Sequence, residues 1–256
     1  MINNFSLRWG ILTLLTVTMA CSDSSNNSTP QGGVTIKEGD LLITDTILGS
    51  LIRVDPVSGD RTLVSDQIGG VPRQIARDID NTFLLTLSEI DFPVILRVDA
   101  ASGQLLIVSS GGSSVDRNVP VIGDGPPFFG PFGLLREPSG QLVVSNQEVS
   151  VLYRVDPITG DRTILSGPNR GEGPAFLGPT KQLAREADGT LLVVVGAPSP
   201  GGDGAIFRVD PVTGNRSILT SADVGQGPTL GEPEGIVLDD GGTLFVSDSA
   251  QATIFQ

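Results

Sequence analysis

Carboxylate and amide side chains recur at corresponding places in this sequence, which has 256 residues and a formal net charge of −13. Four of them close short apolar runs, and a fifth, Glu234, follows a proline directly: the four are Asp45, Glu89, Asn146 and Asp248. Oxygen atoms of this kind are the ligands that calcium and magnesium prefer. One interpretation is a divalent-cation site with Glu234, Asp248 and Asn146 as candidate ligands. The other is that these side chains cap the turns that follow the strands.

Missing residue types restrict the chemistry further. The sequence has no histidine, which excludes a Ser-His-Asp or Cys-His hydrolase, a histidine-liganded metal and a histidine general base. Cys21 is the only cysteine, so internal disulfides and cysteine metal clusters are excluded as well. A nucleic-acid partner is not expected, because the chain is acidic and has only two lysines, Lys37 and Lys181.

Four arginines recur in the same local sequence, at spacings of 44, 57 and 54 residues: Arg53, Arg97, Arg154 and Arg208. Each is followed two residues later by an aspartate. Such a set has two interpretations, a ring that binds anions or salt bridges that repeat because the structural unit repeats. We expect salt bridges, each contributing little where it is exposed.

The segments around these arginines align without gaps and predict β-hairpins, which begin at Leu51, Ile95, Leu152 and Ile206. Apolar and β-branched runs flank turns that mostly read Asp-Pro-x-Ser/Thr-Gly. A second pair of strands precedes a hairpin in four places, starting at Pro72, Pro131, Thr180 and Pro233. Four short antiparallel strands per unit predict an all-β fold, the β-propeller. The 33 glycines and 18 prolines agree with a turn-rich chain.

Two stretches resemble known propellers. LLITDTILGSLIRVDP resembles the NHL repeat, and PEGIVLDDGGTLFVSD resembles the gluconolactonase superfamily; the resemblance covers about 34–256. It implies a propeller whose first strands hold a divalent metal through acidic and amide side chains, for lactone hydrolysis. The corresponding positions here are Arg73, Phe132, Lys181 and Glu234, of which only Glu234 offers a suitable oxygen.

The blade geometry predicts where a ligand would bind. The start of the first strand and the end of the second lie at the same rim of the central channel. The candidate ligand-binding residues at that rim are Asp45, Glu89, Phe132, Asn146, Glu234 and Asp248. No residue is predicted to be catalytic.

Three glycine-rich loops begin at Gly123, Gly171 and Gly225 and are similar in composition to phosphate-binding loops. A phosphate loop must open a helix, whereas these loops precede predicted strands. We therefore expect them to cross between blades, with four side chains packing inward: Phe128, Phe129, Phe176 and Leu230. An apolar patch of Phe128 and Phe129 with Phe132 at the rim is the alternative.

About five units are present, and we favour an incomplete ring of six blades. The alternative is a closed ring of five, in which 34–37 supplies a missing strand. The first thirty residues predict export. Residues 1–20 read as a lipoprotein signal peptide, because an apolar run after Arg8 ends at Thr18-Met19-Ala20-Cys21, which resembles the lipobox of bacterial lipoproteins. Cys21 is then the lipidation site, 21–33 a flexible Ser/Asn/Gly tether and 34–256 the propeller domain.

Together these features predict a lipid-anchored propeller of the bacterial envelope that binds a ligand or protein without catalysis. Its expected partners are the membrane, through the lipid on Cys21, and a protein or small molecule at the channel rim. Because Ser22 is not the aspartate that signals inner-membrane retention, we expect the outer membrane. No cofactor is predicted, apart from the alternative of a divalent cation such as calcium. The alternative functions are a metal-dependent gluconolactonase-like hydrolase and a truncated gene product.

Overall fold

The structure is a computed structural model that describes residues 33–89, 92–111 and 120–256. Within these ranges the regular secondary structure consists of β-strands alone, and no helix there could cross a membrane. Five antiparallel sheets form. The first three contain β1 (Leu41–Asp45), β2 (Ser50–Val54) and β3 (Arg61–Ser65); then β4 (Pro72–Arg77), β5 (Thr82–Glu89), β6 (Phe92–Asp99) and β7 (Leu105–Ser110); then β8 (Pro131–Arg136), β9 (Leu142–Asn146), β10 (Val151–Val155) and β11 (Arg162–Ser166). The last two contain β12 (Thr180–Arg185), β13 (Leu191–Val195), β14 (Ala205–Val209) and β15 (Arg216–Thr220); then β16 (Pro233–Leu238), β17 (Leu244–Asp248) and β18 (Thr253–Phe255).

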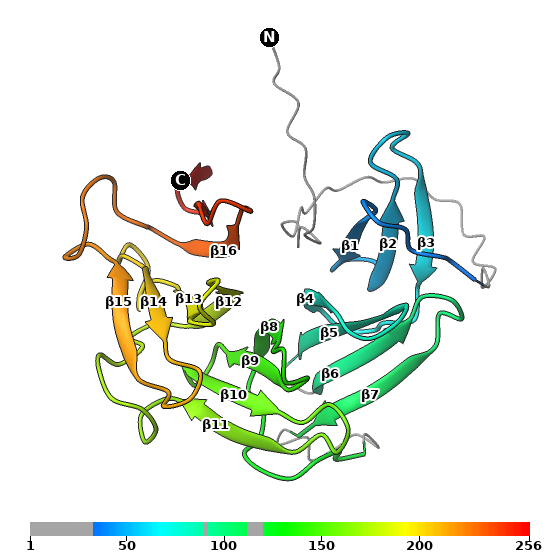
Figure 1. Ribbon diagram of the computed structural model, residues 1–256, viewed down its shortest axis with the longest axis horizontal. Helices are drawn as coiled ribbons and strands as arrows, with labels where there is room; N and C mark the ends of the chain where they lie inside the picture. The colour runs from blue at the N-terminus through cyan, green and yellow to red at the C-terminus, as the bar shows by residue number, and fades with distance from the viewer. Residues whose placement is uncertain (1–32, 90–91, 112–119) are drawn as a thin grey trace.

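The sheets follow one another around a centre, as Figure 1 shows. The first strands of successive sheets pack side by side, with β4 against β8, β8 against β12 and β12 against β16. Each of the four predicted Arg-Val-Asp hairpins lies in its own sheet. The predicted β-propeller is therefore confirmed. Three blades have four strands, whereas the first and fifth have three among the described residues. A sixth blade stays a prediction.

The core lies between the sheets, because the second strands of the middle sheets, such as β9 and β13, are buried on both faces. Neighbouring residues of one strand enter different apolar clusters: Leu85 packs with the first sheet and Leu84 with the third. Likewise Val144 packs toward the second sheet and Val143 toward the fourth. Since side chains alternate across a strand, this pattern requires a neighbour on each face, which radial packing provides.

The predicted salt bridges form at all four repeated arginines. The four arginines pair with acids in the segments that connect first and second strands or precede β1: Arg53 with Asp40, Arg97 with Asp78, Arg154 with Glu137 and Arg208 with Glu186. The aspartates two residues after the arginines turn away to cap the hairpin turns, so that Asp55 stays 3.7 Å from Arg53. The expectation of salt bridges is confirmed, and the structure identifies the acidic partners.

Two further expectations need correction. Residues 34–37 form no strand; instead the Val34 amide donates to the Ala100 carbonyl at 3.1 Å. Phe128, Phe176 and Leu230 are buried as predicted, whereas Phe129 is 38% exposed. The chain bends at Phe129, between the buried Phe128 and the start of β8, and the Phe129 side chain faces outward.

Candidate functional site

The first strands of the second to fifth blades share an irregularity at their start. Strand pairing shifts by at least one residue just after Pro72, Pro131, Thr180 and Pro233. A bulge of this kind leaves a residue out of the ladder and redirects its side chain, and bulges are common beside functional sites. The residues that follow directly are Arg73, Phe132, Lys181 and Glu234. These are the four first-strand positions that the repeat alignment identified.

Contacts between blades fix these positions. The Thr86 hydroxyl donates to the Phe132 carbonyl at 2.5 Å, and the Ser145 hydroxyl donates to the Lys181 carbonyl at 2.5 Å. The backbones approach closely: a Cβ atom on Gly133 would lie 2.3 Å from the Lys181 carbonyl oxygen. Gly133 therefore permits the approach, and the channel-facing ends of the first strands of the second to fifth sheets together form a rim.

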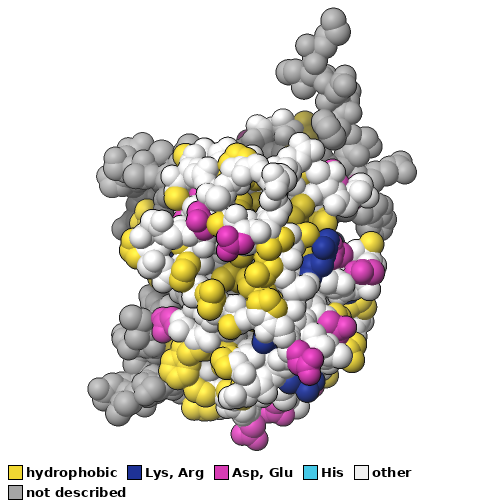
Figure 2. Space-filling model, turned by 90° about the vertical axis from the view of Figure 1, so that its left-hand side faces the viewer, with side chains coloured by type: hydrophobic (Ala, Val, Ile, Leu, Met, Phe, Trp, Pro, Cys, Tyr) yellow, Lys and Arg dark blue, Asp and Glu magenta, His cyan; other side chains and the backbone are white. Residues whose placement is uncertain are grey.

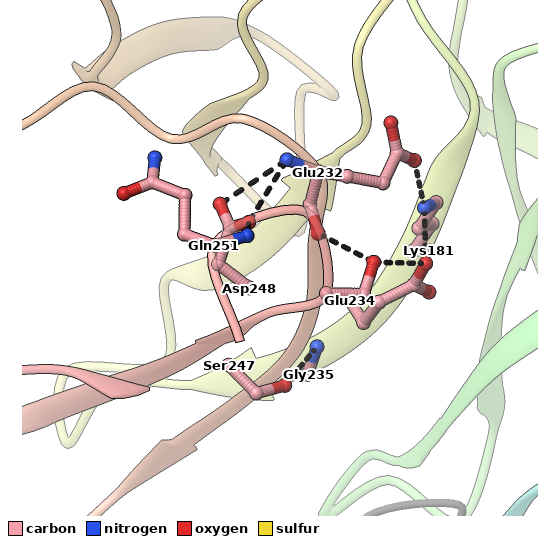
Figure 3. Close-up of polar contacts among 8 residues, drawn as sticks. Lys181, Glu232, Glu234, Gly235, Ser247, Asp248 and Gln251 are labelled. Atoms are coloured by element: carbon pink, nitrogen blue, oxygen red, sulfur yellow. Dashed lines mark hydrogen bonds and ion pairs between the residues drawn. The ribbon is translucent and has the colours of Figure 1, made fainter. Parts of the chain in front are cut away.

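Lys181 lies between two glutamates, as Figure 3 shows. Its ammonium group bonds to Glu232 and, at 2.8 Å, to Glu234. Lys181 is only 6% exposed, whereas both glutamates are partly exposed. The Ser249 hydroxyl donates to the Glu234 carboxylate at 3.4 Å. A nearly buried cation thus holds both carboxylates at the rim.

Arg73 and Phe132 form the second contact of the rim. The Arg73 guanidinium carbon lies 5.6 Å from the centroid of the Phe132 ring, within the range of a cation–π interaction. Arg73 Nε donates to the Ser88 hydroxyl at 2.5 Å. Burial lowers the pKa of Arg73, and the charge of Glu234 opposes that shift. The rim therefore presents a half-buried cation on an aromatic ring.

The predicted second-strand residues lie at the strand ends and bond to the backbone. Asp45 accepts the amides of Ile47 and Leu48 at 2.8 and 2.9 Å. Asn146, with an exposed fraction of 0%, accepts the Phe129 amide at 3.2 Å.

Asp248 makes similar contacts. It is 2% exposed and accepts the amides of Glu232, at 3.1 Å, and Gln251, at 3.0 Å. Glu89 ends β5, where its backbone pairs with Phe92. Asp45 and Asp248 cap the turns that follow their strands, as the turn-capping interpretation expects, whereas Asn146 bonds to the loop that precedes its sheet. A ligand contact by any of the four stays a prediction.

The metal set that the resemblance implies does not fit these residues. Three of the four first-strand positions carry an arginine, a phenylalanine and a lysine, and the carboxylate of the fourth, Glu234, is bonded to Lys181. Across the described ranges, no three Asp, Glu or Cys side chains gather as a metal cluster. Asn146 belongs to the third sheet, whereas Glu234 and Asp248 belong to the fifth. Cys21 lies outside the described residues.

The structure adds two features that the sequence analysis missed. Glu232 belongs to the rim, and the Glu-Pro-Glu sequence at 232–234 was its available signal. A pocket of about 250 Å³ lies beside the glycine- and proline-rich segment 196–204, which connects β13 to β14. Its lining is mostly apolar and includes Leu177, Val195 and Phe207. Figure 2 faces the side of the molecule that carries the fourth and fifth blades, and hydrophobic side chains gather near the centre of this side.

Comparisons with known proteins agree on the fold. No protein-family model matches the sequence, and neither does any curated protein sequence. Among solved structures, a candidate gluconolactonase is 16% identical with a TM-score of 0.57, over 85% of this chain and 70% of the other. Virginiamycin B lyase from Staphylococcus aureus is 14% identical with a TM-score of 0.56, over 88% and 68%. A chain of a nidogen/laminin complex is 19% identical with a TM-score of 0.52, over 81% and 70%. Identities this low establish the β-propeller fold and nothing further.

Proposed function

We propose that this protein is a lipid-anchored β-propeller of the bacterial envelope that binds a protein or small-molecule ligand at its channel rim without catalysis. The observation that carries the proposal is the position of Lys181 between Glu232 and Glu234. The ammonium group of Lys181 is bonded to the carboxylate of Glu234, which is the one first-strand side chain with an oxygen suited to a metal ion. The rim is left with groups that recognise a ligand.

The groups at the rim are suited to recognition. Arg73 uses its Nε–H for Ser88 and has the N–H donors of its two terminal nitrogens left, and its guanidinium rests on Phe132, a half-buried side chain. Glu232 and Glu234 keep exposed carboxylate surface. A ligand with an anionic group beside an apolar group would complement Arg73 and Phe132. Such a charged and aromatic combination is typical of binding surfaces.

Two of the structural neighbours support a role in binding. The catalytically inactive form of the virginiamycin B lyase carries a substituted histidine, and the present sequence has no histidine. The nidogen/laminin neighbour comes from a protein–protein complex. A propeller of this shape is therefore compatible with a role in binding a partner.

Two measurements test the proposal: the melting temperature of the protein with and without divalent metal ions, and its hydrolysis of a lactone in their presence. We expect the melting temperature of the protein to stay within about 1 °C on adding calcium, magnesium, manganese or zinc, since a ligand that binds only the folded state would raise it. We also expect no hydrolysis of an aldonolactone with any of these metals. Glu234→Ala should lower the melting temperature with or without metal, because it removes a partner of Lys181; Glu148→Ala, at an exposed site, is the control.

A different result would favour the hydrolase alternative. That outcome is lactone hydrolysis that requires a divalent metal, is lost in Glu234→Ala and is retained in Glu148→Ala. The proposal of a non-catalytic role would then be wrong.

A further inference from the structure

The pocket beside segment 196–204 has a mostly apolar lining from two parts of the chain. Val195 and Phe207 belong to the strands β13 and β14 on either side of that segment. Ala175 and Leu177 belong to the loop that leads from the third sheet into the fourth. The pocket therefore lies where the strands of one blade meet the loop that enters it.

This pocket faces the third blade, and both blades beside it have four strands. The two faces of the fourth sheet belong to different apolar clusters. Phe207 packs with Val143 of the third sheet, whereas Ile206 packs with Ile236 of the fifth. Since Val195 and Phe207 belong to the cluster shared with the third sheet, the pocket lies on that face. It does not result from the shorter fifth sheet.

Tight backbone contacts hold segment 196–204 at both ends. At its start, a Cβ atom on Gly178 would lie 2.0 Å from the Gly196 carbonyl oxygen. At its end, the Gly204 amide donates to the Leu230 carbonyl at 2.6 Å. The wall that this segment gives to the pocket is therefore fixed by the fold.

The third sheet shows how the equivalent place is closed by the chain itself. Tyr153 in β10 corresponds to Phe207 in β14, because both are the middle residue of the third strand. The Tyr153 hydroxyl donates to the Pro127 carbonyl at 3.2 Å and so joins its strand to the loop before its sheet. Pro127 corresponds to Ala175 in the loop sequences GDGPPF and GEGPAF.

The fourth sheet lacks this hydrogen bond. Phe207 keeps the ring contact, with its centroid 5.0 Å from that of Phe176, but it has no hydroxyl. Ala175 lines the pocket, and its backbone carbonyl accepts no hydrogen bond from the described residues. A donor group of a ligand could therefore make the bond that Tyr153 makes in the third sheet.

The charged side chains of the lining are both acidic. Asp203 belongs to segment 196–204, and Asp223 follows β15. Both are exposed, so they lie where the pocket opens to solvent. Two carboxylates beside an apolar pocket favour a ligand that carries a positive charge.

Two basic side chains adjoin the lining without belonging to it. Lys181 lies near Gly196, and its charge is compensated by Glu232 and Glu234. Arg216 donates to the Pro174 carbonyl at 2.7 Å and to the Ser166 hydroxyl at 2.8 Å. Neither bonds to Asp203 or Asp223, which leaves the acidic preference of the pocket in place.

The volume of the pocket, about 250 Å³, sets the size of its ligand. An apolar cavity of about 150 Å³ holds a benzene molecule. Drug-sized ligands occupy sites of about 300 Å³ or more. The pocket therefore suits a single ring with a short side arm.

We propose that this pocket binds a small primary amine in its ammonium form, with an apolar body about as large as a phenyl ring. The body would contact Val195 and Phe207. The ammonium group would donate to the Ala175 carbonyl, and Asp203 and Asp223 would compensate its charge. This site is additional to the channel rim, since its lining contains none of the rim side chains.

The experiment uses 2-phenylethylammonium as the probe. The whole protein is titrated at low ionic strength, and binding is followed by calorimetry and by saturation-transfer NMR of the probe. We expect saturable binding of the amine. The neutral 2-phenylethanol and the anionic 3-phenylpropanoate should bind at least about tenfold more weakly, because they lack the positive charge. Saturable binding of the alcohol or the acid with equal affinity would overturn the proposal, and so would no saturable binding of the amine.

A matched pair of variants tests the unbonded carbonyl. Phe207→Tyr should weaken binding of the amine about fivefold or more, because the new hydroxyl supplies the donor for Ala175. Tyr153→Phe, the reverse change in the third sheet, should leave the affinity unchanged. The melting temperature of each variant shows that it is folded. Equal effects of the two changes would contradict the assignment of the site to the fourth sheet.

A second pair of variants tests the charge and does not alter the core. Asp203→Asn with Asp223→Asn should weaken binding about tenfold. Asp60→Asn with Asp240→Asn removes the same charge at exposed positions outside the lining and should have no effect. If the two double variants weaken binding equally, the carboxylates of the lining do not recognise the ligand and the proposal is wrong.

A basic group of the chain itself is the alternative occupant. Outside the described ranges the sequence has two basic side chains, Arg8 and Arg117. Arg8 belongs to the predicted signal peptide, and Arg117 to the connection between the second and third sheets. If Arg8→Ala or Arg117→Ala strengthened binding of the amine, that arginine would compete for the pocket, and the proposal of a separate ligand would be wrong.

Discussion

Single aspartates determine the shape of the hairpin turns. Asp55, Asp156 and Asp210 each accept two backbone amides, two and three residues ahead, at 2.7–3.2 Å. These hydrogen bonds are the main reason that the pKa of each carboxyl is lowered from its ordinary value. A lowered pKa means that the folded state binds the ionised form preferentially.

This has a direct consequence for stability against pH. An aspartate in the unfolded chain has a pKa of about 3.9, so the stabilisation from these caps is fully present above that pH. It is lost as the pH falls through the lower pKa of the folded state. We expect the triple variant Asp55→Asn, Asp156→Asn and Asp210→Asn to melt below the wild type at pH 7, and the difference to shrink steadily from pH 4 to pH 2. Melting temperatures followed by circular dichroism measure it.

A matched variant isolates the caps from general charge removal. Asp66, Asp223 and Asp240 are exposed, and their carboxylates cap no turn among the described contacts. Replacing these three by asparagine removes the same charge. If this control shows the same pH-dependent difference as the cap variant, the assignment of the effect to the caps is wrong.

The hairpin turn of the fourth sheet packs against the preceding sheet, and glycine permits the close approach. Gly59 and Gly214 are equivalent residues of two hairpin turns, and both have φ of +77°. A Cβ atom on Gly214 would lie 2.0 Å from the Leu165 carbonyl oxygen, whereas one on Gly59 would meet no described atom within 4 Å. Alanine at Gly59 would change only the backbone conformational energy, whereas alanine at Gly214 would also disturb a contact between two sheets. Comparing the two variants therefore separates these contributions to the free energy of unfolding.

The corresponding alanine variants should differ in stability. We expect Gly59→Ala to lower the free energy of unfolding by about 1–2 kcal/mol, because an L-residue is strained at positive φ. Gly214→Ala should cost at least about 2 kcal/mol more, since the backbone of the neighbouring segment must also move. Urea unfolding gives both values. Equal losses would contradict the tight contact between turn and preceding blade.

At the scale of strands and turns, the sequence predicted the hairpins and the blades that they form. The hairpins follow from local chemistry, as in the turn at Asp156 and Gly160, and their repetition predicted the blades. The partner of each repeated arginine was not predictable, because Glu137 approaches Arg154 only after the strands pair. The burial of Arg162 was not predictable either, because in the sequence it is an arginine beside a hairpin turn, a position that is usually exposed. Its burial depends on a loop 36 residues earlier in the chain.

At the scale of the whole molecule, the sequence predicted where the rim lies but not which of its side chains contact one another. Alignment of the repeats identified Arg73, Phe132, Lys181 and Glu234 as equivalent, and all four lie in the bulge of their first strand. Which of them touch depends on how adjacent blades are placed around the axis. The pairing of Lys181 with Glu232 and Glu234 joins two sheets, and a repeat pattern holds no information on such a contact.

The sequence also predicts that a lipid on Cys21 anchors the whole molecule to a membrane. Cys21 is the only cysteine, and a lipid there would hold the propeller at a membrane through the polar segment 22–33. Stable anchoring needs more than one acyl chain, so the modified protein should resist extraction by high salt. We expect the wild type, expressed in a bacterium, to pellet with membranes and to enter the detergent phase.

Two substitutions test the anchor and its destination. Cys21→Ser removes the thiol to which the lipid would be attached, so this variant should leave the detergent phase, whereas Ser24→Ala should behave as the wild type. Ser22→Asp should keep the lipid and move the protein from outer-membrane to inner-membrane fractions on a density gradient, because it introduces the retention signal. A Cys21→Ser protein that stays in the detergent phase would show that some other part of the chain holds it there. The acidic propeller, at a net charge of −13, is itself repelled by anionic lipid surfaces, so the loss of the anchor should release it completely.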